Sequence, residues 1–211
     1  MVIQLSEDRI WFPALQLADE DGLLAVGGDL SVQRLLLAYR NGIFPWFSED
    51  DPILWYAPQE RFVLFPKNLK VSSSMLKIIQ SGKFRITYNQ AFSQVLTACA
   101  NSNRKGQEGT WITAAMKSAY IRLFDLGYAH SIEVWENHLL VGGLYGVKVN
   151  HVFCGESMFT KVSNASKIAL IYLCQNFNFK VIDCQVYTNH LESLGADFIS
   201  VEEYLAVLKD I

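Results

Sequence analysis

The chain has 211 residues, of which 51% are hydrophobic and 18% charged, and its 18 Lys and Arg against 21 Asp and Glu give a formal net charge of -3. This composition, with 13 Gly and 5 Pro, is typical of a soluble globular protein and excludes a disordered, collagen-like or low-complexity chain. The longest apolar run, residues 168–174, is far shorter than the roughly 18 residues needed to cross a bilayer.

The first 59 residues are rich in turns and aromatic side chains and contain one clear helical pattern. Ser31 is a typical N-cap, the apolar positions after it have helical spacing, and Gly42 provides a stop. The helix leads directly into the aromatic loop 44–47. We expect residues 1–59 to form a small N-terminal α/β domain.

From residue 60 onward, strand and helix patterns alternate more regularly. Strands are predicted at residues 61–65, 84–88, 129–135, 139–147, 151–158, 180–186 and 197–200. Helices are predicted at residues 73–80, 113–126, 164–177 and 189–194 and at the C-terminal end. A further helix, which contains Phe92 and Cys99, is expected after Asn89 as its N-cap. This order predicts an α+β domain over residues 60–211, with a central mixed sheet resembling the acetyltransferase (GNAT-like) fold.

A carboxylate and an amide occupy the predicted strand 180–186. Strand side chains alternate, so we expect Asp183 and Gln185 on one face and their apolar neighbours on the other. Asp183 could then orient the Gln185 amide through its NH2 group and leave the amide oxygen to accept from a substrate amine. The pattern alone slightly favours a half-exposed strand with two solvated polar residues.

Glu156 is the single charged residue of the segment 153–159. A buried carboxylate is costly unless it is paired, so Glu156 either receives a cationic or amine substrate or pairs with a lysine such as Lys161 or Lys167. Six large apolar residues would suit a side-chain pocket if the fold brings them together, although most residues of this kind are simply core: Trp46, Trp111, Leu144, Phe153, Phe177 and Ile182.

Several other kinds of site find no support in the sequence. The four cysteines are scattered without a C-x-x-C pair, which predicts buried thiols in a reducing cytoplasm, and no secretory signal pattern opens the chain. The histidines lack ligand-like spacing, so we expect no metal site. No phosphate-loop, dinucleotide or nucleophile-elbow motif occurs.

Seven segments together resemble the signatures of bacterial leucyl/phenylalanyl-tRNA-protein transferases, in that family's order. They are residues 22–30 (GLLAVGGDL), 42–47 (GIFPWF), 109–113 (GTWIT), 130–135 (HSIEVW), 153–159 (FCGESMF), 164–167 (NASK) and 182–185 (IDCQ). The resemblance covers nearly the whole chain. It implies an enzyme that moves Leu or Phe, less often Met, from aminoacyl-tRNA to the α-amino group of proteins beginning with Arg or Lys, which marks them for N-degron degradation. It also implies no metal or other cofactor, no membrane partner and a monomer.

The resemblance further assigns roles to individual residues. Asp183 and Gln185 would activate the amine, and Glu156 would position the substrate amine or the acceptor. The six apolar residues named above would line the donor side-chain pocket, with Leu144 standing where Met is expected, and Tyr120 would contact the terminal adenosine. The basic surface toward tRNA would retain Lys77, with Lys83 and Arg85 nearby.

Two other functions compete with this interpretation. An acyl-CoA-dependent N-acetyltransferase would suit the fold, but such enzymes use a Gly-rich turn for the pyrophosphate, and residues 159–164 contain no glycine. A non-catalytic module could instead bind apolar N-termini or peptides in the aromatic pocket, with Glu156 recognising the amine.

Overall fold

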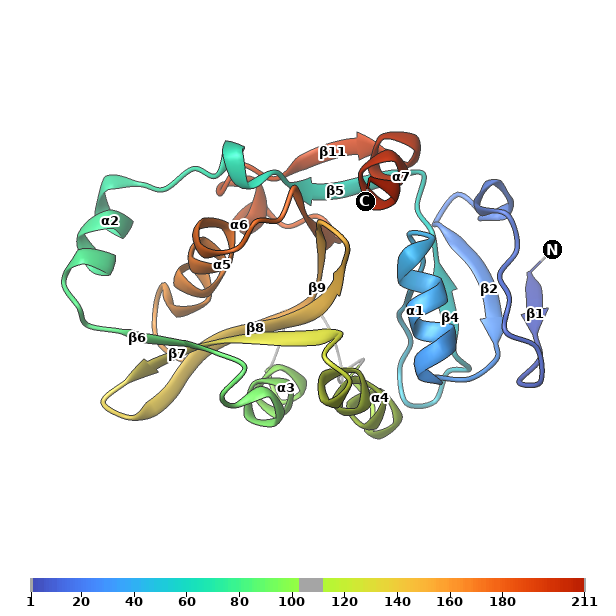
Figure 1. Ribbon diagram of the computed structural model, residues 1–211, viewed down its shortest axis with the longest axis horizontal. Coiled ribbons are helices and arrows are strands. Elements are labelled where there is room, and N and C mark those ends of the chain that lie inside the picture. The colour runs from blue at the N-terminus through green and yellow to red at the C-terminus, as the bar shows by residue number, and fades with distance from the viewer. Residues whose placement is uncertain (1, 103–111, 211) are drawn as a thin grey trace.

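The computed structural model describes residues 2–102 and 112–210, which form two β-sheets (Figure 1). The smaller sheet has the order β1-β2-β4-β3, from β1 (Ile3–Leu5), β2 (Leu23–Gly27), β3 (Phe44–Pro45) and β4 (Leu54–Tyr56). The predicted helix is present as α1 (Val32–Arg40), and Ser31 accepts from the Arg34 N–H at its start. These strands were not predicted individually, because turn residues break the apolar pattern into pieces too short for periodicity to identify.

The larger sheet has seven strands in the order β11-β5-β10-β9-β8-β7-β6. They are β5 (Glu60–Leu64), β6 (Arg85–Tyr88), β7 (Ala129–Glu136), β8 (Leu139–Val149), β9 (Val152–Thr160), β10 (Val181–Gln185) and β11 (Asp197–Ser200). Strands β9 and β10 are parallel and the other neighbours are antiparallel. The predicted mixed sheet is therefore confirmed.

Helices cover both faces of this sheet (Figure 1). Helices α3 (Phe92–Ala100) and α4 (Ala114–Asp125) pack on one face, and α5 (Ala165–Asn176) packs on the other. The remaining helices are α2 (Ser73–Gln80), α6 (Asn189–Glu192) and α7 (Val201–Lys209), and short 3-10 turns occupy Leu15–Leu17 and Pro66–Asn68. None of the helices in the described ranges is long and apolar enough to span a membrane.

The start of α3 differs from the prediction. Asn89 does not cap it; its backbone is left-handed, with φ of 56°, and its side chain accepts from the Ser131 N–H. The buried carboxylate of Glu133, on β7, instead accepts from the backbone N–H groups of Gln90 and Ala91, at 3.4 and 3.3 Å. A distant strand thus supplies an acceptor for the backbone N–H groups at and just before the N-cap position, Ala91.

The two sheets share one hydrophobic core. Helix α1 packs against α4 and β8, and its buried residues Leu35 and Tyr39 belong to the same apolar cluster as Tyr120 and Val147 of the larger unit. The N-terminal unit is consequently packed firmly against the face of the larger sheet that carries α3 and α4.

Candidate active site

A cavity of about 380 Å³ opens where the loop after α1 meets strands β8, β9 and β10 and helices α5 and α6. Its volume lies in the range of ligand-binding pockets. Its apolar lining includes Phe44, Pro45, Trp46, Leu144, Phe153, Met158, Leu170, Leu173, Ile182, Val186 and Leu191, and its polar lining includes Glu156, Asp183, Gln185, Thr188 and His190. An apolar wall with a few polar groups suits a ligand that has an apolar side chain and one reactive polar end.

The structure brings together most of the predicted site residues. Trp46, Leu144, Phe153 and Ile182 line the cavity together with the three polar residues Glu156, Asp183 and Gln185. Trp111 lies outside the described residues. Phe177 does not line the cavity: its ring packs against Tyr88, Tyr172 and Phe179, at centroid distances of 4.7 to 6.3 Å.

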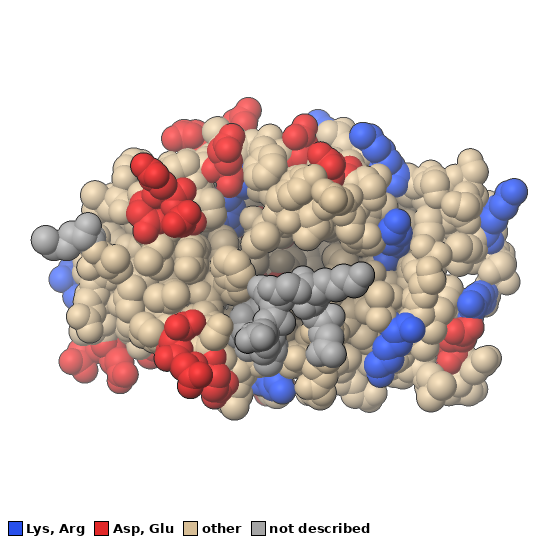
Figure 2. All heavy atoms as spheres, turned by 180° about the vertical axis from the view of Figure 1, so that it is seen from behind, with Lys and Arg blue, Asp and Glu red and all other residues tan. Residues whose placement is uncertain are grey.

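The predicted tRNA-contacting residues lie away from the cavity. Lys77 is exposed on α2, Lys83 pairs with Glu136 at 3.2 Å, and the Arg85 guanidinium lies 5.1 Å from the ring centre of Trp135. On the face of the molecule shown in Figure 2, Lys and Arg side chains predominate on the half with α2, whereas Asp and Glu predominate on the half with the smaller sheet. The charge on this face is therefore polarised.

Glu156 is held in the cavity wall by hydrogen bonds, and neither Lys161 nor Lys167 forms an ion pair with it. Its side chain accepts from the Tyr120 hydroxyl at 2.6 Å and from the Gln185 amide Nε2 at 2.9 Å. Burial raises the pKa of Glu156 to about 7, although both hydrogen bonds act to lower it. A carboxyl group with a pKa near neutrality can accept a proton and give it up again at physiological pH.

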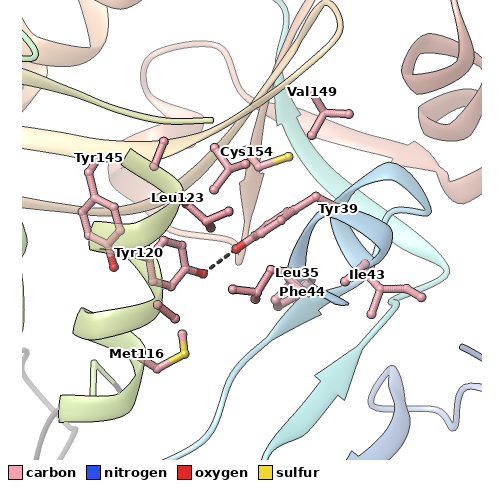
Figure 3. Packing of buried hydrophobic residues seen from close by; sticks show 14 of the residues in the cluster. Leu35, Tyr39, Ile43, Phe44, Met116, Tyr120, Leu123, Tyr145, Val149 and Cys154 are labelled. Atoms are coloured by element: carbon pink, nitrogen blue, oxygen red, sulfur yellow. Dashed lines mark hydrogen bonds between the residues drawn. The ribbon is translucent and has the colours of Figure 1, made fainter. Parts of the chain in front are cut away.

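Two buried tyrosines extend this contact into the N-terminal unit. Tyr39 of α1 and Tyr120 of α4 point toward one another across the shared core and form a short hydrogen bond (Figure 3). Because the single hydroxyl proton of Tyr120 goes to Glu156, Tyr39 is the donor of that bond. Tyr120 is fully buried and does not line the cavity, so its predicted contact with adenosine stays a prediction.

Asp183 is fully buried and sits in a second network. It forms an ion pair with the guanidinium of Arg61 on β5, and it accepts from the Tyr204 hydroxyl of α7 at 2.7 Å. Burial acts to lower the pKa of Arg61, but the charge of Asp183 outweighs it and raises that pKa above its ordinary value. Arg61 therefore keeps its positive charge beside Asp183.

The contact between Asp183 and Gln185 differs from the expected one. Asp183 Oδ1 accepts from the backbone N–H of Gln185 at 3.0 Å, while the Gln185 side-chain NH2 points to Glu156. The pairing of β10 with β5 shifts between these two residues, and Gln185 adopts a left-handed backbone with φ of 60°. The simple alternation predicted for the strand fails because this bulge turns the Gln185 side chain toward β9.

Sequence reasoning missed Tyr39, Arg61 and Tyr204. Arg61 could have been noticed as a charged residue next to the apolar run 62–65, but the two tyrosines lie in ordinary helical patterns.

The described residues contain no group of three or more His, Cys, Asp or Glu arranged to hold a metal ion. What the site does offer is a proton-accepting carboxyl group and an amide beside an apolar cavity, which suits transfer of an activated acyl group to an amine.

Comparisons with known proteins point to one family. Residues 63–209 match the family described as "Leucyl/phenylalanyl-tRNA protein transferase", and residues 28–59 match the N-terminal domain of the same family. Proteins of that name from Flavobacterium johnsoniae and Syntrophus aciditrophicus are 53% and 56% identical to the chain. The alignments cover 95% of this chain in both cases, and 96% and 85% of the relatives.

A further relative of the same name, from Klebsiella pneumoniae, is 50% identical over 98% of this chain and 90% of its own. Among solved structures, a GCN5-related N-acetyltransferase from Kribbella flavida aligns at 8% identity with a TM-score of 0.38, over 74% of this chain and 56% of its own. Given the family match over most of the chain and the identity to relatives over nearly all of it, the chain is an aminoacyltransferase that belongs to the leucyl/phenylalanyl-tRNA protein transferase family.

Proposed function

We propose that the enzyme transfers Leu or Phe, and less readily Met, from aminoacyl-tRNA to the α-amino group of proteins that begin with Arg or Lys. The observation that carries this proposal is the Glu156–Gln185 pair in the wall of an apolar cavity. The apolar wall would bind the donor side chain, and the pair would handle the amine. The transferred residue would mark the acceptor for N-degron degradation in the cytoplasm, and the enzyme would act as a monomer.

The donor side chain would enter between Trp46, Phe153 and Ile182, with Leu144 at the same wall. A side chain that branches at the γ-carbon is narrow near the backbone and fills such a cavity further in, so Leu and Phe fit better than β-branched Ile and Val. Discrimination of this kind is worth about 1 to 3 kcal/mol per methylene. Trp111, which the family resemblance places in the same pocket, is proposed as an additional wall residue.

The reaction forms a peptide bond and releases the tRNA ribose. The neutral acceptor amine attacks the ester carbonyl carbon, the bond from that carbon to the ribose oxygen breaks, and the ribose oxygen leaves with the proton that the amine nitrogen loses as the peptide bond forms. The acceptor α-ammonium, with an ordinary pKa of about 7.7 to 8, must first lose a proton. Glu156, whose pKa is about 7, is well matched to accept it, and the Gln185 amide oxygen would orient the amine.

The rest of the chain would serve substrate binding. Lys77 lies on α2, and Lys83 and Arg85 lie just before and at the start of β6; all three are proposed to contact the tRNA acceptor stem. We propose a boundary between domains 1–59 and 60–211, since the chain leaves the smaller sheet at Tyr56 and enters the larger one at Glu60. Tyr120 would act on the adenosine side of the donor.

The test is transfer from radiolabelled Leu-tRNA to a peptide that begins with Arg. Label should appear on the free-amine peptide and not on its N-acetylated counterpart, and acetyl-CoA should not serve as donor. The Glu156→Gln variant, which keeps the size of the side chain but cannot accept a proton, should lose most of the activity. Absence of transfer from Leu-, Phe- and Met-tRNA by folded protein would overturn the proposal and favour a binding module.

A further inference from the structure

The buried cluster of Arg61, Asp183 and Tyr204 needs an explanation of its own. A buried ion pair usually contributes little net stability, because the cost of removing two charges from water offsets their attraction. Here the pair is also completed by a tyrosine hydroxyl from the C-terminal helix, so that all three side chains are at most 1% exposed. A costly cluster immediately behind a catalytic strand suggests a task in the site.

Asp183 uses its two oxygens for different purposes. Oδ2 receives Arg61 and Tyr204, and Oδ1 receives the backbone N–H of Gln185. With Oδ2 held on two sides, the carboxylate cannot rotate, and Oδ1 is fixed under the bulge. A non-glycine residue such as Gln185 adopts a left-handed backbone only where its surroundings impose it. The bond from Asp183 is therefore part of what directs the Gln185 amide toward Glu156.

Arg61 reaches the other half of the site as well. Its Nη1 donates to the backbone carbonyl of Gly42 at 2.9 Å, and its guanidinium carbon lies over the rings of Phe44 and Tyr204, at 4.9 and 4.6 Å from their centres. Gly42 precedes the segment 44–46, which forms one wall of the cavity. One planar guanidinium thus joins the bulge that carries Gln185 to the wall that would receive the donor side chain.

We infer that Arg61 and Tyr204 are positioning residues for the transfer reaction: Tyr204 acts on Gln185 through Asp183, and Arg61 acts both on Gln185 and on the aromatic wall at residues 44–46. This inference rests on the proposed function. Arg suits the role because it donates in a fixed fork, whereas a lysine ammonium cannot satisfy Asp183 and Gly42 with the same geometry.

The decisive experiment is a double-mutant cycle on kcat. Tyr204→Phe should lower kcat roughly 10-fold, since small misplacements of reacting groups have effects of that size, and should leave KM for Leu-tRNA unchanged. In a Gln185→Asn background, which keeps a residue that tolerates the left-handed backbone but shortens the amide, the same change should lower kcat less than about two-fold. Equal losses in both backgrounds, or no loss in the first, would overturn the role of Tyr204.

Two further variants separate positioning from simple stability. Asn150→Asp removes the 2.8 Å hydrogen bond from the Asn150 amide to the Leu208 carbonyl, which anchors the same helix α7 without touching Asp183. It should lower the melting temperature but leave kcat unchanged. Arg61→Lys should lower kcat and raise KM for Leu-tRNA, and a change in kcat alone would overturn the link to the aromatic wall.

A readout that needs no catalysis distinguishes failure of this inference from failure of the proposed function. Hydrogen exchange of the backbone N–H of Gln185 can be followed by NMR with 15N-labelled glutamine. The exchange should become at least about 10-fold faster in Tyr204→Phe and stay slow in Asn150→Asp. If the wild-type enzyme transfers nothing, the proposed function fails, and this measurement still decides whether Tyr204 positions Gln185 through Asp183. Unchanged protection in Tyr204→Phe would overturn it.

Discussion

Removal of the Tyr120 hydroxyl should change the pH dependence of transfer more than its maximum rate. The Tyr120→Phe variant loses the 2.6 Å hydrogen bond that stabilises ionised Glu156. A hydrogen bond to a charged group contributes about 1.5 to 3 kcal/mol, and 1.36 kcal/mol corresponds to one pKa unit. The pKa of Glu156, about 7 in the wild type, should therefore rise by roughly one to two units.

If Glu156 must be ionised to accept the proton, activity rises with pH through this pKa. At pH 7 the variant should be slower than wild type by roughly 5-fold to 50-fold, and most of the difference should disappear by about pH 9.5. The assay is kcat/KM for Leu-tRNA and an Arg-initiated peptide between pH 5.5 and 9.5, corrected for hydrolysis of the aminoacyl ester. Since the acceptor amine titrates identically for both enzymes, the ratio of the two profiles isolates Glu156.

Tyr39→Phe is a graded comparison, because the Tyr39 hydroxyl bonds to Tyr120 and also acts to lower the pKa of Glu156, after Tyr120 itself. It should shift the profile less than Tyr120→Phe does. A ratio of variant to wild type that stays constant across the pH range would refute the role of Glu156 as the proton acceptor, even if the variant were slow.

Three further results are expected. The pKa of Glu156 in the folded state, about 7, lies above its ordinary value of 4.5. Its contribution to the free energy of unfolding is therefore complete below about pH 4.5, and about 3 kcal/mol is lost as pH rises through 7. Chemical denaturation of Glu156→Gln at a series of pH values should lack this decline. Leu144→Ala enlarges the cavity and should raise the ratio of Phe to Leu transfer roughly 10-fold in a mixed-donor assay. An unchanged ratio would show that Leu144 does not contact the donor side chain. Glu133→Gln would place a side-chain NH2 group against the hydroxyl and backbone N–H groups that donate to this carboxylate. It should lower the free energy of unfolding in urea by about 2 kcal/mol. The control Glu136→Gln changes a half-buried residue near the end of the same strand, paired with Lys83, and should lower it much less.

Local patterns predicted the helices well because helix starts are local events. Ser31, Thr113 and the serine before α2 each accept the backbone N–H three residues on, and such caps can be recognised within a short window of sequence. The start of α3 shows where this approach fails. Glu133 lies more than 40 positions from the N–H groups that it satisfies, so a local rule selected Asn89 instead.

The candidate site, too, was predictable from the sequence only in part. The type and order of residues identified Glu156, Asp183 and Gln185, but their contacts depend on a bulge that period-two alternation does not contain. Arg61 is 122 residues from Asp183 in sequence, and Tyr204 lies 21 residues beyond it, so no spacing rule joins the three. Phe177 belongs to an aromatic stretch that looks much like a pocket wall, yet it packs against Phe179 and Tyr88.

The position of Tyr39 and Trp46 bears on what the two units of the chain do. Both residues come from the N-terminal unit, yet Trp46 lines the cavity and Tyr39 completes the hydrogen-bond chain that ends on Glu156. At the other end of the chain, α7 supplies Tyr204 to Asp183. Because Arg61 joins Gly42 to Asp183, displacement of either unit would move both the donor wall and the amide that faces the amine. The boundary between the sheets is therefore a structural division that the active site spans.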